Sequence, residues 1–96
     1  MTELMEPTEI LAQIPPGWKL GEAGNTLSKT YQFENFISAF GWMTQIAMIA
    51  EKMNHHPEWR NVYRTVEVTL TTHDVGGLTA KDITLAQKMN EAARNA

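Results

Sequence analysis

The longest run of apolar positions in the chain covers residues 33–53, and its spacing predicts an amphipathic helix. Apolar side chains recur at steps of three and four residues, which places them on one face of a helix. This band comprises Phe36, Ile37, Phe40, Met43, Ala47 and Ala50, and a second band beside it comprises Trp42, Ile46, Ile49 and Met53. Because such a helix has no fully wet side, we expect it to lie on a sheet and to meet a further partner. A second copy of the helix is the simplest partner, and cover by Trp18 and the terminal helices is the alternative.

Alternating apolar and polar positions on both sides of this helix predict two hairpins. The first joins residues 18–20 to residues 26–32 through a glycine-containing turn. The second joins residues 59–63 to residues 66–71, with its turn at Arg64 and Thr65. The positions that should face the core are Leu27, Tyr31 and Phe33 in the first hairpin, where Lys29 is the exception, and Val66, Val68 and Leu70 in the second.

Shorter helices are expected near both ends of the chain. Thr8 can cap one that runs to Gln13, and Thr79 and Asp82 have the spacing of a capping box for the other. The last helix carries Ile83, Ala86, Met89 and Ala93 on one stripe. The order of elements predicts an α+β fold, with a four-stranded antiparallel sheet and three helices packed on one face. At 96 residues, positions 1–96 are expected to form a single domain.

Composition and charge exclude several classes of function. The net charge of -3 and the absence of any run of basic residues argue against nucleic acid and anionic membranes as partners. The chain has no cysteine, so disulfides, thiolate metal sites and cysteine nucleophiles are excluded. Residues 35–50 are too short to span a bilayer. Residues 1–9 carry three glutamates and no basic residue, unlike a signal peptide, and we expect a cytoplasmic protein.

The three histidines are the most informative polar residues. His55 and His56 follow the long helix directly and precede Pro57, which ends it, while His73 follows the last strand. We expect the fold to bring His73 back against the other two. Imidazole both donates and accepts protons near neutral pH, so the cluster indicates acid–base chemistry. The ordinary alternative is a solvated pair of histidines at a helix end.

A metal site receives less support from the same residues. Glu51 and the three histidines offer oxygen and nitrogen ligands, but adjacent histidines rarely chelate one ion and no H-x-x-x-H or H-E-x-x-H pattern is present. We therefore expect no metal and keep a metal-dependent hydrolase as a third hypothesis. Trp59, beside the histidines, can stack on a planar ligand or belong to the core.

Two linked motifs resemble one known family. Residues 51–59 read E-K-M-N-H-H-P-E-W, and residues 72–82 read T-H-D-V-G-G-L-T-A-K-D. In this order they resemble pterin-4a-carbinolamine dehydratase, and the resemblance extends over most of residues 15–90. It implies dehydration of a 4a-hydroxytetrahydropterin to quinonoid dihydropterin and water. This substrate is the form of the tetrahydropterin cofactor that is left after an aromatic amino acid hydroxylase has used it. It implies no metal and no organic cofactor.

The resemblance also implies site residues. In the family, the histidines that match His55, His56 and His73 surround the pterin. The remaining substrate-binding candidates are Glu51, Asn54, Trp59, Thr71, Thr72, Asp74 and Asp82; animal members carry aspartate where this chain has Asn54. Loss of the 4a-hydroxyl needs one proton delivered to oxygen and one removed from N5. Our hypothesis is that His55 and His73 exchange these protons, while His56, assisted by Glu51, orients the substrate; the sequence leaves the division between His55 and His56 open.

Family members also act as non-enzymatic partners, which gives a second hypothesis: a dimerisation or coactivator-type binding module. Retention of all three histidines favours chemistry, since a scaffold does not need them. For either function the resemblance implies a homodimer or homotetramer, and we expect it to form through the long helix at 33–53.

Overall fold

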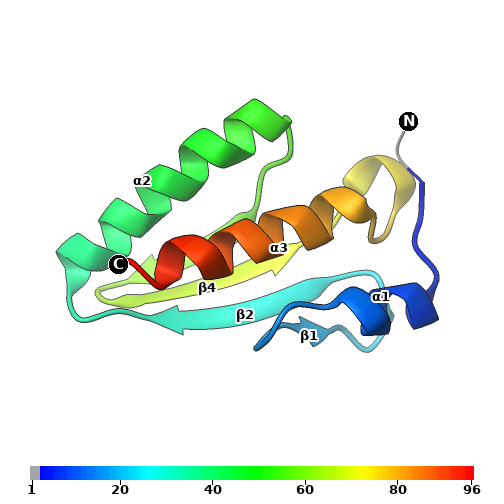
Figure 1. Cartoon of the computed structure of the whole chain (residues 1–96), viewed down its shortest axis with the longest axis horizontal. Coiled ribbons are helices and arrows are strands. Elements are labelled where there is room, and N and C mark those ends of the chain that lie inside the picture. The colour runs from blue at the N-terminus through cyan, green and yellow to red at the C-terminus, as the bar shows by residue number, and fades with distance from the viewer. Residues whose placement is uncertain (1–2) are drawn as a thin grey trace.

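The chain folds into one antiparallel sheet with its helices on a single face, which confirms the predicted α+β architecture (Figure 1). The computed structural model describes residues 3–96. Its elements are α1 (Pro7–Gln13), β1 (Lys19–Leu20), β2 (Leu27–Gln32), α2 (Phe36–Met53), β3 (Glu58–Val62), β4 (Thr65–Leu70), a 3-10 turn η1 (His73–Val75) and α3 (Ala80–Ala93). The strand order is β1-β2-β4-β3, so the two hairpins join through the β2–β4 pair at the centre of the sheet.

The turn of the second hairpin lies one residue earlier than expected. Val62 pairs with Thr65, so the turn residues are Tyr63 and Arg64 rather than Arg64 and Thr65. Tyr63 has a φ of 53°, a conformation that normally favours glycine or asparagine. The Asn61 side-chain amide holds this turn by donating hydrogen bonds to the carbonyl oxygens of Tyr63 (3.1 Å) and Thr65 (2.9 Å). As a result β3 begins at Glu58, opposite Thr69 near the end of β4.

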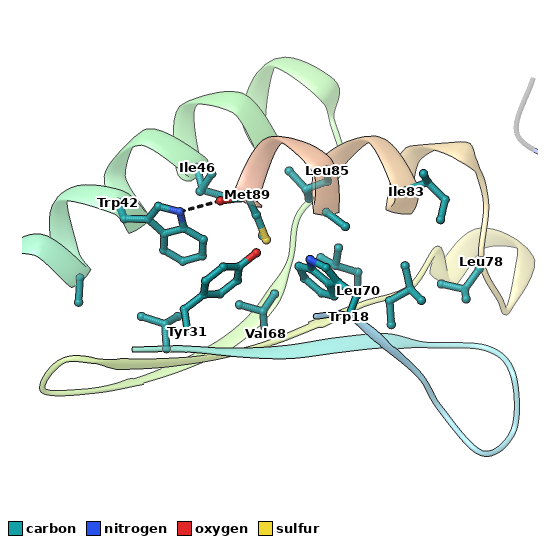
Figure 2. Packing of buried hydrophobic residues seen from close by; sticks show 14 of the residues in the cluster. Trp18, Tyr31, Trp42, Ile46, Val68, Leu70, Leu78, Ile83, Leu85 and Met89 are labelled. Carbon is teal, nitrogen blue, oxygen red and sulfur yellow. Dashed lines mark hydrogen bonds between the residues drawn. The ribbon is translucent and has the colours of Figure 1, made fainter. Parts of the chain in front are cut away.

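The core lies between the sheet and the inner faces of α2 and α3 (Figure 2). Trp42 is 1% exposed, packs against the ring of Tyr31 and donates its indole N–H to the carbonyl oxygen of Met89 at 3.0 Å. The buried residues of α2 are Ala39, Trp42, Ile46 and Ala50, so most of the inner face comes from the second apolar band. The predicted stripe of α3 is confirmed for Ile83, Ala86 and Met89, which are buried.

The outer face of α2 remains apolar and exposed. Its large exposed side chains are Phe36, Ile37, Phe40 and Met48, between 46% and 81% accessible. The second band is covered in part as the alternative expected, because Trp42 packs against the terminal helix α3 through Met89, whereas Trp18 packs against Tyr31. It is mainly the first band that stays exposed. Assembly through this face stays a prediction.

Both ends of α2 are set by asparagine. The helix begins at Phe36 rather than residue 33, because the side chain of Asn35 accepts the amide N–H of Ser38 at 2.8 Å. At the other end Asn54 adopts the left-handed conformation (φ 53°, ψ 44°), which asparagine tolerates better than most residues. The reversal at Asn54 directs the chain back towards the sheet, immediately before the histidines.

Lys29, the exception on the core face of β2, is satisfied by Asn90 of α3. The Oδ1 atom of Asn90 accepts hydrogen bonds from Lys29 Nζ (2.9 Å), from the indole N–H of Trp18 (3.2 Å) and from the Tyr31 hydroxyl. Its Nδ2 donates to the carbonyl oxygen of Pro16 at 3.0 Å. Burial raises the pKa of the Tyr31 hydroxyl, which keeps it protonated as a donor, and burial lowers the pKa of Lys29. One amide thus joins the N-terminal segment, β2 and α3.

The N-terminal segment packs against the loop after η1. The amide N–H of Met5 donates to the carbonyl oxygen of Leu78 at 2.8 Å, and Ile10 of α1 is 1% exposed in the core. A Cβ atom placed on Gly77 would lie 2.6 Å from Cδ2 of Leu4. A side chain at position 77 would therefore displace the exposed side chain of Leu4.

Replacing Gly77 by alanine is expected to lower the free energy of unfolding by about 1 kcal/mol, because Leu4 must swing off the loop. In a Leu4→Ala background the same substitution should cost less than about 0.5 kcal/mol, since the obstructing methyl group is gone. Urea denaturation of the four variants measures this coupling. Leu11→Ala, which truncates an exposed leucine of α1, is the matched background and should give no rescue.

Candidate active site

The antiparallel β3–β4 hairpin brings the three histidines to one end of the sheet. His55 and His56 precede β3, and His73 follows β4, so the start of one strand lies beside the end of the other. The imidazole Nε2 of His73 is 3.7 Å from a carboxylate oxygen of Glu58, the first residue of β3. The hypothesis that His73 returns to the segment after α2 therefore agrees with the topology.

His55 is the buried member of the three. It is 7% exposed, and its Nε2 lies 2.6 Å from Oδ1 of Asp82. Its backbone N–H donates to the carbonyl oxygen of Ala50 at 3.0 Å, which closes the end of α2 around Asn54. Asn54 itself is exposed and acts as the C-cap that turns His55 inward.

Asp82 lies behind His55 and is 0% exposed. Besides His55, its carboxylate accepts the Thr72 hydroxyl at 2.7 Å and the amide N–H of Thr79 at 3.0 Å, both through Oδ2. The hydroxyls of Thr72 and Thr79 are 2.9 Å apart. The capping box predicted for Thr79 and Asp82 is confirmed, and the same carboxylate also holds a histidine.

The other two histidines lie on the surface, each beside a glutamate. His56 Nε2 is 2.8 Å from the Glu51 carboxylate, and these side chains are 58% and 80% exposed. Glu51 thus pairs with His56, not with His55 one turn away. His73 and Glu58 are similarly exposed, so both pairs are screened by water and stabilise the fold by less than about 1 kcal/mol.

The remaining predicted residues are distributed around this end of the molecule. Trp59 is half-buried, and its ring centroid is 6.1 Å from that of Trp42, which places the indole against the core. Thr71 donates its hydroxyl to the carbonyl oxygen of Asn25 at 2.7 Å, Thr72 is buried beside Asp82, and Asp74 is exposed in η1. Glu58 was not expected from the sequence; the signal for it is the register of the second hairpin, which faces it towards His73.

Two further observations concern ligands and membranes. Among residues 3–96, no group of three or more histidine, aspartate or glutamate side chains is arranged to hold a metal ion. In the same range, every helix is too short or too polar to cross a bilayer.

Each of the three imidazoles therefore faces one carboxylate through Nε2. An imidazole held through one nitrogen can donate or accept a proton through the other. A buried His–Asp pair with two solvent-facing histidines at one end of an α+β domain is an arrangement that can carry out acid–base chemistry.

Comparison with known proteins identifies the family to which this chain belongs. The profile of the family described as pterin 4 alpha carbinolamine dehydratase matches residues 3–92. A relative from Jannaschia sp. (strain CCS1), provisionally named a pterin-4-alpha-carbinolamine dehydratase, is 62% identical over 78 residues, or 81% of this chain and 80% of its own. A relative of the same provisional name from Rhizobium johnstonii is 56% identical over 93 residues, covering 95% and 92% of the two chains. The chain belongs to the pterin-4a-carbinolamine dehydratase family, which confirms the predicted family and the enzyme class, a hydro-lyase.

Two solved structures extend the comparison. The crystal structure of a transcriptional coactivator/pterin dehydratase from Brucella melitensis has a TM-score of 0.88 and 39% identity, covering 95% of this chain and 99% of that one. A pterin dehydratase-like protein identified as a RuBisCO assembly factor in the α-carboxysome has a TM-score of 0.69 and 18% identity, over 80% and 89% of the chains. At that identity the second structure supports the fold alone.

Proposed function

We propose that this chain dehydrates a 4a-hydroxytetrahydropterin to quinonoid dihydropterin and water. The observation that carries this function is the buried His55–Asp82 pair at the same end of the sheet as His73. Family membership supports the substrate class, and the imidazoles provide the proton donor and acceptor that dehydration needs.

In the proposed reaction the bond between C4a and the hydroxyl oxygen breaks. A protonated imidazole delivers a proton to the departing oxygen, which leaves as water. A second, neutral imidazole removes the N5 proton, and the electron pair of the N5–H bond forms the N5–C4a double bond. His55 and His73 take these two roles, and each such group contributes about 100- to 10,000-fold to the rate. His56, held by Glu51, orients the ring.

The proposed setting is tetrahydropterin recycling in the cytoplasm, where an aromatic amino acid hydroxylase supplies the carbinolamine. The substrate-contacting residues proposed alongside the histidines are Asn54, Thr71 and Asp74, which are at least partly exposed at this end of the molecule. Trp59 borders the site from the core side.

A direct turnover assay tests this function. Purified protein should accelerate the loss of water from chemically generated 4a-hydroxytetrahydropterin well above the spontaneous rate. Exhaustive treatment with a chelator should leave the rate unchanged, because the proposed donors and acceptors are imidazoles; loss of activity on chelation would instead show that dehydration depends on a metal. A rate equal to the spontaneous one overturns the proposal.

The second candidate is a dimerisation or coactivator-type module, favoured by the exposed apolar band of α2. An open hollow of about 700 Å³ adjoins this band and is lined by Thr44, Ala47, Met48, Glu51 and Lys52. If pairing through α2 is the whole function, a charge introduced on this face, as in Phe40→Glu, should abolish pairing, whereas histidine variants should still pair. Sedimentation of the wild type and of Phe40→Glu distinguishes assembly through this face from a monomer.

A further inference from the structure

Asp82 is the only buried acidic residue among residues 3–96. A buried carboxylate is costly unless every oxygen is hydrogen bonded, and this one is held at 2.6, 2.7 and 3.0 Å by an imidazole, a hydroxyl and a backbone amide. No buried side-chain nitrogen or oxygen in that part of the chain lacks a partner. We propose that Asp82 is a positioning residue for two histidines at once, and that it touches no substrate. This role rests on the proposed dehydration.

The contact between Asp82 and His55 determines which ring nitrogen of His55 exchanges a proton with substrate. Oδ2 of Asp82 accepts two donors, the Thr72 hydroxyl and the Thr79 amide, so this oxygen acts only as an acceptor. Oδ1 is left to face His55. An ionised carboxylate only accepts, so the proton of neutral His55 must reside on Nε2. Nδ1 then carries the lone pair, and His55 exchanges its proton with substrate through Nδ1.

The contact with Thr72 extends the same control to His73. Thr72 directly precedes His73, and its backbone pairs with Gly77 through hydrogen bonds of 2.8 and 3.3 Å, which close the loop that carries His73. Its hydroxyl donates to Asp82 and accepts from Thr79. One carboxylate therefore sets the separation between an imidazole after α2 and an imidazole after β4.

Asp82→Asn tests this assignment. The amide oxygen of the new side chain is needed by the donors of Thr72 and Thr79, so its NH2 group faces His55 and forces the proton onto Nδ1. We expect kcat to fall by about 100- to 10,000-fold with KM changed less than about threefold, and the ¹⁵N spectrum of His55 to switch from the Nε2–H to the Nδ1–H tautomer. Glu91→Gln, an exposed acid on the same helix, should change neither.

Thr72→Val separates the effect of Asp82 on His73, which passes through Thr72, from its direct effect on His55. It should shift the His73 resonances and lower kcat while His55 keeps its Nε2–H tautomer, and Thr72→Ser should restore both. If Asp82→Asn fails to fold, the two variants Thr72→Val and Thr72→Ser still test the link between Asp82 and His73. An unchanged His55 tautomer in Asp82→Asn, or a switched tautomer with full kcat, would overturn the positioning role. A wild-type protein without dehydratase activity, yet with the Nε2–H tautomer, overturns the proposed function while leaving the geometry of Asp82 intact.

Discussion

Replacing His55 or His73 by alanine is expected to lower kcat for dehydration by about 100- to 10,000-fold each, because each imidazole transfers one proton in the proposed reaction. His56→Ala should mainly raise KM, since His56 lies on the surface beside Glu51 and is proposed to orient substrate. Stopped-flow measurement of the dehydration step, on freshly generated carbinolamine and across pH, separates these effects.

The His55 variant needs its own control, because removing the imidazole leaves the buried Asp82 without one of its three partners. Loss of one partner of a buried hydrogen bond costs about 1–3 kcal/mol, so part of the protein could unfold at the assay temperature. Thermal denaturation of each variant shows what fraction is folded, and rates are compared per folded molecule. Full activity in both His55→Ala and His73→Ala would contradict the acid–base assignment.

The sequence was sufficient for the elements of the fold but not for the orientation of α2. Spacing alone placed two apolar bands on that helix, and both satisfy the same periodicity. The buried band is the one with Trp42, because the indole N–H finds its acceptor at Met89, on a helix 47 residues further along the chain. That contact depends on how α2 and α3 pack, which no local pattern encodes.

The same limit applies to the candidate site. The expected hairpin predicted that His73 returns to the segment after α2, and the hairpin exists, although its turn is displaced by one residue. The register of the hairpin places Glu58 beside His73. Because the predicted turn was displaced by one residue, the sequence did not reveal this pair. Asp82 was recognisable as a capping residue from its spacing to Thr79, but its contact with His55 joins the ends of α2 and α3 and depends on tertiary packing.

Asn90→Ala is expected to lower the free energy of unfolding by about 2–4 kcal/mol. The substitution removes four hydrogen bonds, each worth about 1 kcal/mol, and leaves the donors of the buried Trp18 and Tyr31 and of the partly buried Lys29 without their common acceptor. Part of that cost is recovered because water can reach Lys29, which keeps the expected loss below the sum for fully buried groups. Urea denaturation monitored by tryptophan fluorescence measures the change.

Two matched variants separate the contribution of the Oδ1 acceptor of Asn90 from that of its whole side chain. Asn90→Asp keeps an oxygen for the three donors and adds an ion pair with Lys29, while it loses the donor to Pro16, so a change below about 1 kcal/mol is expected. Asn95→Ala truncates an exposed asparagine just beyond α3 and should be neutral. Equal losses in the alanine and aspartate variants at position 90 would show that the Pro16 contact, and not the shared oxygen, holds the N-terminal segment to β2 and α3.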